Sequence, residues 1–157
     1  FGAEYANYAS DCTRAIPVDG CFTKRQKQIY SSVLRVLRET KKLIVAGSTI
    51  QAYHQEACKY IEEELLLLGL ITKNDIANQS IKSPAYFRYF MHGVSHFLGL
   101  DTHDVGAKDV VLEPGMLVTC EPGIYILEEE IGIRLENDIL VTAQGNEDLT
   151  GNIPFFE

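Results

Sequence analysis

The sequence predicts an α+β fold in which helices cover one face of a mainly antiparallel sheet. Three observations lead to this prediction. Residues 1–18 have the pattern of a β-hairpin, residues 23–69 carry two long stretches of helical periodicity, and the chain after His92 holds short apolar runs between turn signals. No internal repeat or linker interrupts this order. The 157 residues are therefore expected to belong to one domain.

The first stretch is rich in β-forming residues. Tyr5, Tyr8 and Ile16 lie in it, and Pro17 with Asp19-Gly20 closes it with a turn signal. This pattern predicts two strands, with their junction near residues 9–11.

The two predicted helices have recognisable starts and stops. Thr23 followed by Gln26 matches a capping box, and the apolar face that begins there runs until Gly47. Thr49 is the expected N-cap of the second helix, which carries its apolar face inward as far as Gly69. Each helix is thus long enough to cover a sheet.

The rest of the chain reads as short elements. Residues 72–82 are polar and predict a loop or a short turn of helix, and Ser83-Pro84 opens a short aromatic helix. Pro-Gly and Gly turns then separate five expected strands: Val94–Leu98, Leu117–Glu121, Gly123–Leu127, Ile131–Leu135 and Asp138–Thr142.

Composition excludes several classes of protein. A net charge of −8 and a pI near 5.0 argue against a nucleic-acid partner. No apolar run approaches the ~20 residues of a membrane span. The four cysteines show no CxxC pairing, which favours reduced thiols and a cytoplasmic location. The chain begins at Phe1 without a methionine, so we expect it to be part of a longer protein.

Three segments are dense in side chains that bind metals, at residues 8–11, 92–104 and 121–138. Three of the four histidines, His92, His96 and His103, lie within twelve residues of one another. In a strand, His92 and His96 would point to the same face. Any one of them alone fits a hydrogen-bonded core histidine, but the cluster favours a site.

Two glutamates lie at the ends of apolar strands. Glu121 follows one strand and precedes Pro-Gly, so its carboxylate is carried into or beside the core, where a charge is costly unless it is paired or bound to a cation. The alternative is a carboxylate that reaches solvent at the turn. Glu136 shares a strand face with Arg134, and the two could instead form a salt bridge.

The residue types in these segments indicate the kind of ion. Carboxylates with one imidazole and no cysteine ligand suit Mn²⁺, Co²⁺ or Zn²⁺. Two such ions roughly 3.5–4 Å apart repel each other, so a pair of ions needs bridging carboxylates. A water between the ions can ionise near neutral pH and attack a carbonyl.

Together these segments resemble the pita-bread metallopeptidases, and within them the bacterial aminopeptidase P (Xaa-Pro aminopeptidase) branch. The resemblance covers nearly the whole chain. It is carried by a hairpin, a histidine motif and glutamate motifs at residues 2–20, 92–106, 112–116, 121–125 and 132–138.

The resemblance implies a metal centre. Asp11 and Glu136 would bridge two divalent ions, while His96 and Glu121 bind one of them. Mn²⁺ is the expected ion, and Co²⁺ or Zn²⁺ are the alternatives. A further aspartate ligand would precede Phe1 directly, so this chain alone is expected to be inactive and to bind metal incompletely.

The resemblance also implies the roles of the other residues. Glu121 would relay protons toward the leaving proline nitrogen, and His92 and His103 would contact the substrate and its tetrahedral intermediate. Arg134 would hold a ligand carboxylate in place. The fourth histidine, His54, lies outside every motif and is assigned no role.

The implied whole protein releases the N-terminal residue from peptides that have proline second, and it is expected to be a homo-oligomer. Residues 1–157 would be the C-terminal part of a pita-bread catalytic domain, with an N-terminal domain and the start of the catalytic domain preceding them. A prolidase is the nearest alternative, because it has the same ligands. A creatinase-like hydrolase or a non-catalytic peptide-binding module of the same fold is expected to lack ligands that this chain keeps.

Overall fold

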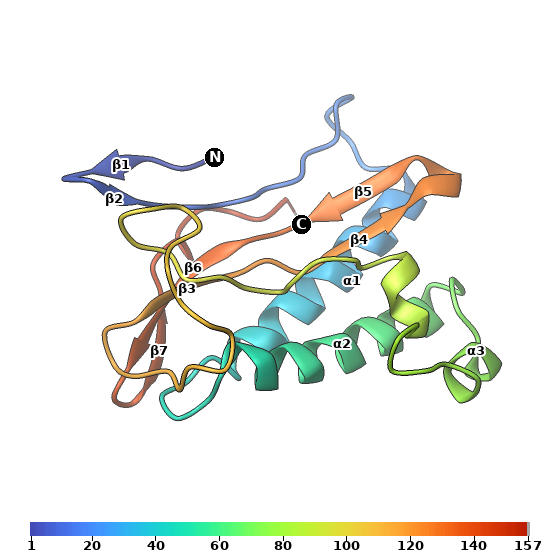
Figure 1. The fold of residues 1–157 in the computed structure, drawn as a ribbon. Coiled ribbons are helices and arrows are strands. Elements are labelled where there is room, and N and C mark those ends of the chain that lie inside the picture. Colours follow the sequence, from blue (N-terminus) through green and yellow to red (C-terminus); the bar gives the residue numbers. More distant parts are fainter. Residues whose placement is uncertain (157) are drawn as a thin grey trace.

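The computed structural model describes residues 1–156, which form a layer of helices against a layer of antiparallel strands (Figure 1). The predicted α+β class is therefore confirmed. The elements in chain order are β1 (Glu4–Tyr5), β2 (Tyr8–Ala9), α1 (Lys24–Lys41), α2 (Ile50–Leu67), α3 (Lys73–Ala77), η1 (Ala85–Arg88), β3 (Leu117–Cys120), β4 (Gly123–Ile126), η2 (Leu127–Glu129), β5 (Ile131–Arg134), β6 (Asn137–Thr142) and β7 (Gly145–Asp148).

The strands pair in three small sheets. β1 pairs with β2, β4 pairs with β5, and β6 lies between β3 and β7, all antiparallel. An isolated bridge between Thr13 and Glu136 joins the segment after β2 to the residue before β6. This bridge joins the N-terminal segment to the C-terminal strands. Figure 1 shows both termini on the same side of the molecule.

One continuous core joins the two layers. The inward faces of both long helices are almost fully buried, because their apolar residues recur at helical spacing. These residues are Ile29, Val33 and Leu37 on α1 and Ala57, Ile61 and Leu65 on α2. They belong to the same cluster as Val118, Ile124, Ile133 and Ile139 of the strands. Burying this apolar surface holds the helices against the sheets.

Both long helices begin as predicted. Thr23 and Gln26 form a reciprocal capping box, and the Thr49 side chain caps α2. The end of α1 is a correction, because the helix stops at Lys41 and not at Gly47. The three residues after Lys41 donate to carbonyls three positions back, so the chain tightens before it turns.

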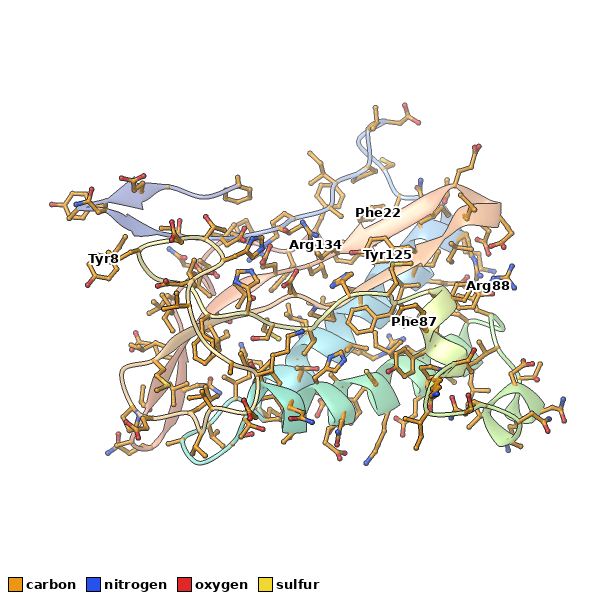
Figure 2. All side chains as sticks on the ribbon, viewed as in Figure 1. Tyr8, Phe22, Phe87, Arg88, Tyr125 and Arg134 are labelled. Carbon is orange, nitrogen blue, oxygen red and sulfur yellow. The ribbon has the colours of Figure 1, made fainter. Side chains whose placement is uncertain are left out.

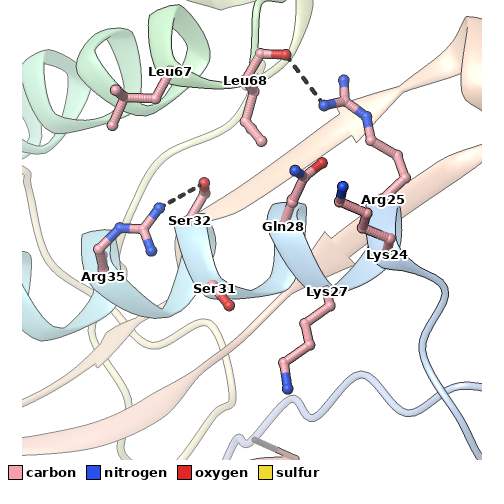
Figure 3. A pocket seen from close by; sticks show the side chains of 9 residues that line it. All are labelled: Lys24, Arg25, Lys27, Gln28, Ser31, Ser32, Arg35, Leu67 and Leu68. Atoms are coloured by element: carbon pink, nitrogen blue, oxygen red, sulfur yellow. Dashed lines mark hydrogen bonds between the residues drawn. The ribbon is translucent and has the colours of Figure 1, made fainter.

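Two arginines of α1 bind groups outside this helix, and Figure 3 shows one of these contacts, from Arg25 to the Leu68 carbonyl. Arg35 donates to both carboxylate oxygens of Glu64 on α2, at 2.7 and 2.6 Å. Arg25 donates to the Leu68 carbonyl at 3.1 Å and, through two nitrogens, to Glu129 at 2.7 Å. These contacts occupy both guanidinium groups in the groove between the helices.

Residues 94–98 are not a regular strand, contrary to the prediction. The segment lies antiparallel to β3, but it makes one isolated bridge, between Phe97 and Val118. The reason is that side chains replace part of the backbone ladder. The His96 N–H donates to the Thr119 hydroxyl at 3.1 Å, and the Ser95 hydroxyl donates to the Thr119 carbonyl at 2.5 Å.

The N-terminal hairpin turns earlier than predicted, at Ala6 and Asn7, which both have positive φ. β7 was not predicted because Gly145–Asp148 is polar throughout. The side chain of Asn146 makes specific contacts instead, because it donates to the carbonyl of Lys41, the last residue of α1, at 2.7 Å and to that of Ile44 at 2.8 Å. The short helix expected within residues 72–82 is present as α3.

Two predictions from composition also have a structural outcome. All four cysteines are free thiols, as expected from their spacing. Within residues 1–156, no helix has both the length and the apolar character needed to cross a membrane.

Candidate metal centre

The β1–β2 hairpin and the start of β6 place Asp11 beside Glu136. The Glu136 N–H donates to the Thr13 carbonyl at 3.1 Å, which pins the two segments side by side. The Asp11 N–H donates to an oxygen of Asp138 at 3.2 Å, so β6 also fixes the backbone at Asp11. Residues 125 positions apart in the sequence thus supply neighbouring carboxylates.

β3 and the segment beside it place the other two predicted ligands. Hydrogen bonds from β3 hold His96, and the N–H of Glu121 donates to the Val94 carbonyl at 2.9 Å. His96 Nε2 then lies 3.7 Å from Asp11 Oδ2 and 3.7 Å from Glu121 Oε1. Ligand atoms of Asp11, His96 and Glu136 all lie within 4.8 Å of one another.

The orientation of His96 fits a metal ligand. Its Nδ1 is 2.9 Å from the Phe97 carbonyl, and a carbonyl can only accept, so Nδ1 carries the proton. If the ring is neutral, Nε2 presents a lone pair toward two carboxylates, and these three groups repel one another. A cation bound between them would attract all three. The separation of 3.7 Å is too long for a hydrogen bond. It suits two ligands that each stand about 2.1 Å from a shared ion.

The acids at this site are short of positive partners. The pKa of Glu121 is raised to about 7, mainly by burial and then by the nearby carboxylate of Glu136. Burial also raises the pKa of Glu136, although a hydrogen bond from Thr13 opposes this. The pKa of Asp138 is raised to about 6, again mainly by burial. A site that raises several carboxyl pKa values together is one where a bound cation would be stabilising.

His92 has different partners from His96. Its Nδ1 is 2.7 Å from the Gly93 carbonyl and its Nε2 is 2.8 Å from the Tyr125 hydroxyl. Both ring nitrogens are thereby satisfied, and burial lowers the pKa of the ring. Neither ring nitrogen of His92 faces the carboxylates of the centre through a contact of its own, and its predicted role as a substrate contact stays a prediction.

Tyr125 reaches His92 along the face of the β4–β5 hairpin, from which Arg134 also projects (Figure 2). A Cβ atom at Gly123 would lie 2.6 Å from the Tyr125 hydroxyl, and one at Gly132 would lie 3.1 Å from the Tyr125 ring. The two glycines thus leave the space that the ring fills.

His103 packs against His96, with ring centroids 4.4 Å apart and planes at 71°. All seven predicted site residues therefore lie in or beside one region of the strand layer. His54 lies outside it, where its Nδ1 accepts the Val94 N–H at 3.4 Å. Glu128 and Glu129 lie outside the centre too, and form ion pairs with Arg88 and Arg25.

Arg134 contacts Glu136 through an intermediary. Its Nε donates to the Thr13 hydroxyl at 3.3 Å, and that hydroxyl donates to Glu136 Oε2 at 2.5 Å. The sequence reasoning did not single out Thr13, Tyr125 or Asp138. Thr13 and Asp138 lie two residues from a predicted ligand, and Tyr125 lies four residues from one. Their position within the same motifs as the ligands could have indicated a role for them.

Carboxylates gathered around one imidazole form a donor set that suits a divalent cation, which is the kind of site that a metalloprotein of this fold would use. Residues 1–143 match metallopeptidase family M24, and the chain belongs to that family. The family is one of metallopeptidases, which agrees with a centre that suits divalent ions.

The chain is similar to several Xaa-Pro aminopeptidases. It is 42% identical to that of Escherichia coli, over 97% of this chain and 37% of the relative. Identity to that of Haemophilus influenzae is 40%, over 98% and 38%. A solved structure of zinc-substituted E. coli aminopeptidase P in complex with product superposes with a TM-score of 0.87 at 39% identity, over 97% of this chain and 37% of that one.

These likenesses confirm the predicted pita-bread fold. The chain spans somewhat more than a third of the length of these relatives.

Proposed function

We propose that the protein containing this chain is an Xaa-Pro aminopeptidase with two metal ions. It would release the N-terminal residue from peptides whose second residue is proline. The observation that carries the proposal is the geometry of His96, whose Nε2 faces two carboxylates at 3.7 Å. The names and solved structures of its relatives support the choice of substrate.

In this proposal Asp11 and Glu136 would bridge the two ions, and His96 and Glu121 would bind one of them. The oxygen-rich donor set supports Mn²⁺, while Co²⁺ and Zn²⁺ fit the same set. The zinc-substituted form of the E. coli relative is in line with that tolerance.

The proposal places this chain in the C-terminal part of a pita-bread catalytic domain. Relatives that it matches over 97% of its own length are far longer, since the match covers 37% of the first of them. We expect the segment before Phe1 to supply the remaining aspartate ligand, the start of that domain and an N-terminal domain. Assembly into a homo-oligomer and a cytoplasmic location, which four free thiols suit, belong to the same proposal.

The residues of the chain have distinct tasks in this reaction. When bound, the ions supply Lewis acidity and activation of water. Glu121 accepts a proton from the attacking water and passes it to the leaving proline nitrogen. The raised pKa of Glu121, about 7 in the metal-free site, supports this role. His92 and His103 contact the substrate, and the hydroxyl of Tyr125 keeps His92 in one orientation.

The test uses the full-length protein loaded with Mn²⁺ and three substrates: a tripeptide with proline second, the same tripeptide with alanine second, and an Xaa-Pro dipeptide. We expect release of the first residue from the proline tripeptide and little from the alanine tripeptide. Preference for the dipeptide would instead identify a prolidase.

Two histidine variants complete the test. His96→Ala should abolish hydrolysis and weaken metal binding, whereas His54→Gln, a histidine outside the site, should leave both unchanged. A folded His96→Ala protein that still cleaves the peptide would remove the ligand assignment.

A further inference from the structure

The Thr13 hydroxyl stands between a guanidinium and the most buried carboxylate of the metal centre. It accepts from Arg134 Nε at 3.3 Å and donates to Glu136 Oε2 at 2.5 Å. The Glu136 residue is 1% exposed, so water has little access to take over this hydrogen bond. A buried carboxylate oxygen depends on such partners for its orientation.

The direction of these hydrogen bonds is fixed by chemistry. Arg134 Nε–H can only donate, so it uses a lone pair of the hydroxyl and leaves the single hydroxyl proton for Glu136. A chain of donors that starts at a charged group polarises each bond along it. The charge of Arg134 therefore reaches Glu136 through Thr13.

The backbone around Thr13 is held in place independently of its side chain. Thr13 and Glu136 pair across an isolated bridge. Arg14 Nη1 donates to both of their carbonyls, at 3.0 and 2.7 Å. Because the two backbones are fastened together, removal of the hydroxyl alone should change the carboxylate orientation without separating the strands. The β-branched side chain of Thr13 also has few rotamers, which aims the hydroxyl.

We infer that Thr13 is a positioning residue for Glu136, and that Arg134 acts on this carboxylate through the Thr13 hydroxyl. The inference rests on the proposed function, because Glu136 is taken there as a bridging ligand. Thr13 occupies one lone pair of Oε2 and so fixes the orientation in which the remaining lone pairs of the carboxylate would hold the ions. Thr13 is not itself among the residues proposed as ligands or substrate contacts.

The experiment measures Mn²⁺ affinity of the full-length protein by calorimetry, with steady-state kinetics on the proline tripeptide. Thr13→Val removes the hydroxyl and keeps the shape, and Thr13→Ser keeps the hydroxyl. Thr40→Val is the matched control, because the Thr40 hydroxyl is buried on α1 without a hydrogen-bond partner among the described residues. Thr13→Ala replaces Thr13→Val in the comparison if the valine protein does not fold.

We expect Thr13→Val to weaken Mn²⁺ binding by about 10–100-fold, as loss of an outer partner of a ligand does. Its kcat should fall while KM for the peptide stays unchanged. Thr13→Ser should restore affinity and kcat to near the wild-type values, and Thr40→Val should leave both unchanged. Wild-type affinity in Thr13→Val, or a serine variant as weak as the valine variant, would overturn the inference.

A double-mutant cycle tests the part played by Arg134. If Arg134 acts through Thr13, Arg134→Lys should weaken Mn²⁺ binding in the wild type and have a much smaller effect in the Thr13→Val protein. Additive effects would show that Arg134 acts on the centre by another route.

The measurements also separate this inference from the function on which it rests. A wild-type protein that binds no pair of ions, or does not cleave the peptide, would contradict the proposed function. A wild type that does both, with Thr13→Val unchanged, would contradict only the role of Thr13.

Discussion

Glu64 on α2 and Glu136 before β6 are both buried glutamates, 8% and 1% exposed, but their carboxylates have opposite surroundings. Glu64 receives two charge-assisted hydrogen bonds from Arg35. Glu136 lies near the acids Asp11 and Glu121, and a hydroxyl is its hydrogen-bond partner.

The helix layer thus neutralises its buried carboxylate with its own guanidinium. The strand layer gathers carboxylates with too little positive charge, which is the arrangement that a bound cation completes. The same residue type therefore stabilises the fold in one layer and destabilises the metal-free fold in the other. Four predictions follow this contrast from the largest effect to the smallest.

Glu136→Gln should produce the largest effect, on activity. It should lower kcat/KM for the proline tripeptide by more than about 100-fold. Loss of a residue that only hydrogen-bonds to a metal ligand costs up to about 100-fold, and loss of the ligand itself should cost more. Because the substitution removes a carboxylate whose pKa burial raises, thermal stability of the metal-free protein should not fall. A clear loss of metal-free stability would mean that Glu136 is held by the fold and not by metal.

The second prediction concerns pH in the metal-free protein. The folded pKa of Glu121, about 7, lies above its ordinary value of 4.5, so the folded state holds this proton after the unfolded state has lost it. Its contribution to stability is therefore present below about pH 4.5 and is lost as pH rises to about 7. Relative to Glu121→Gln, the wild type should lose on the order of 3 kcal/mol across this window.

Thermal unfolding of both proteins in a chelator measures this difference. The comparison with Glu121→Gln cancels the opposite contribution of His92, whose pKa is lowered by burial. Addition of Mn²⁺ should remove the loss in the wild type. A pH-independent difference would show that Glu121 titrates normally.

Glu64→Gln should change stability in the sense opposite to Glu136→Gln. It removes the charge that pairs with Arg35, and the unfolding free energy should drop by about 1 kcal/mol, because the guanidinium is half exposed and can turn to solvent. Chemical denaturation measures the drop, and Mn²⁺ affinity is the control, since it should not change. A Glu64→Gln protein as stable as the wild type would contradict the proposed contrast between the two layers.

Glu129→Gln should have the smallest effect. The Arg25–Glu129 pair is about one third exposed on each side, so its loss should cost only a few tenths of a kcal/mol. Arg25 keeps its hydrogen bond to the Leu68 carbonyl in this variant. A loss of unfolding free energy as large as that of Glu64→Gln would show that the solvent exposure of the side chains does not set the strength of these ion pairs.

Local patterns predicted much of the fold, because helix starts, helix faces and turns are set by nearby residues. The capping box at Thr23 and the cap at Thr49 are examples. β7 escaped prediction because its residues are polar and serve contacts with α1. The segment with His96 differs from a regular strand because Ser95 and Thr119 side chains replace ladder bonds, which no periodicity reveals.

The site was predicted by residue type and motif, and the structure brings the predicted residues together. What the sequence could not indicate is which group contacts which. Arg134 and Glu136 were expected to share a strand face and could have paired directly, but β5 ends at Arg134 and the Thr13 hydroxyl lies between the two side chains. Tyr125 was not assigned a role because its contact with His92 spans 33 positions and depends on how the β4–β5 hairpin lies.

The fit of Tyr125 over Gly123 and Gly132 has a consequence for comparing sequences of this kind. A methyl group at either glycine would push the ring, and with it the hydroxyl that holds His92. The three positions are therefore not free to vary one at a time. A relative with a larger residue at position 123 or 132 should also have a smaller or differently shaped side chain at position 125, and should orient the histidine at position 92 by other means.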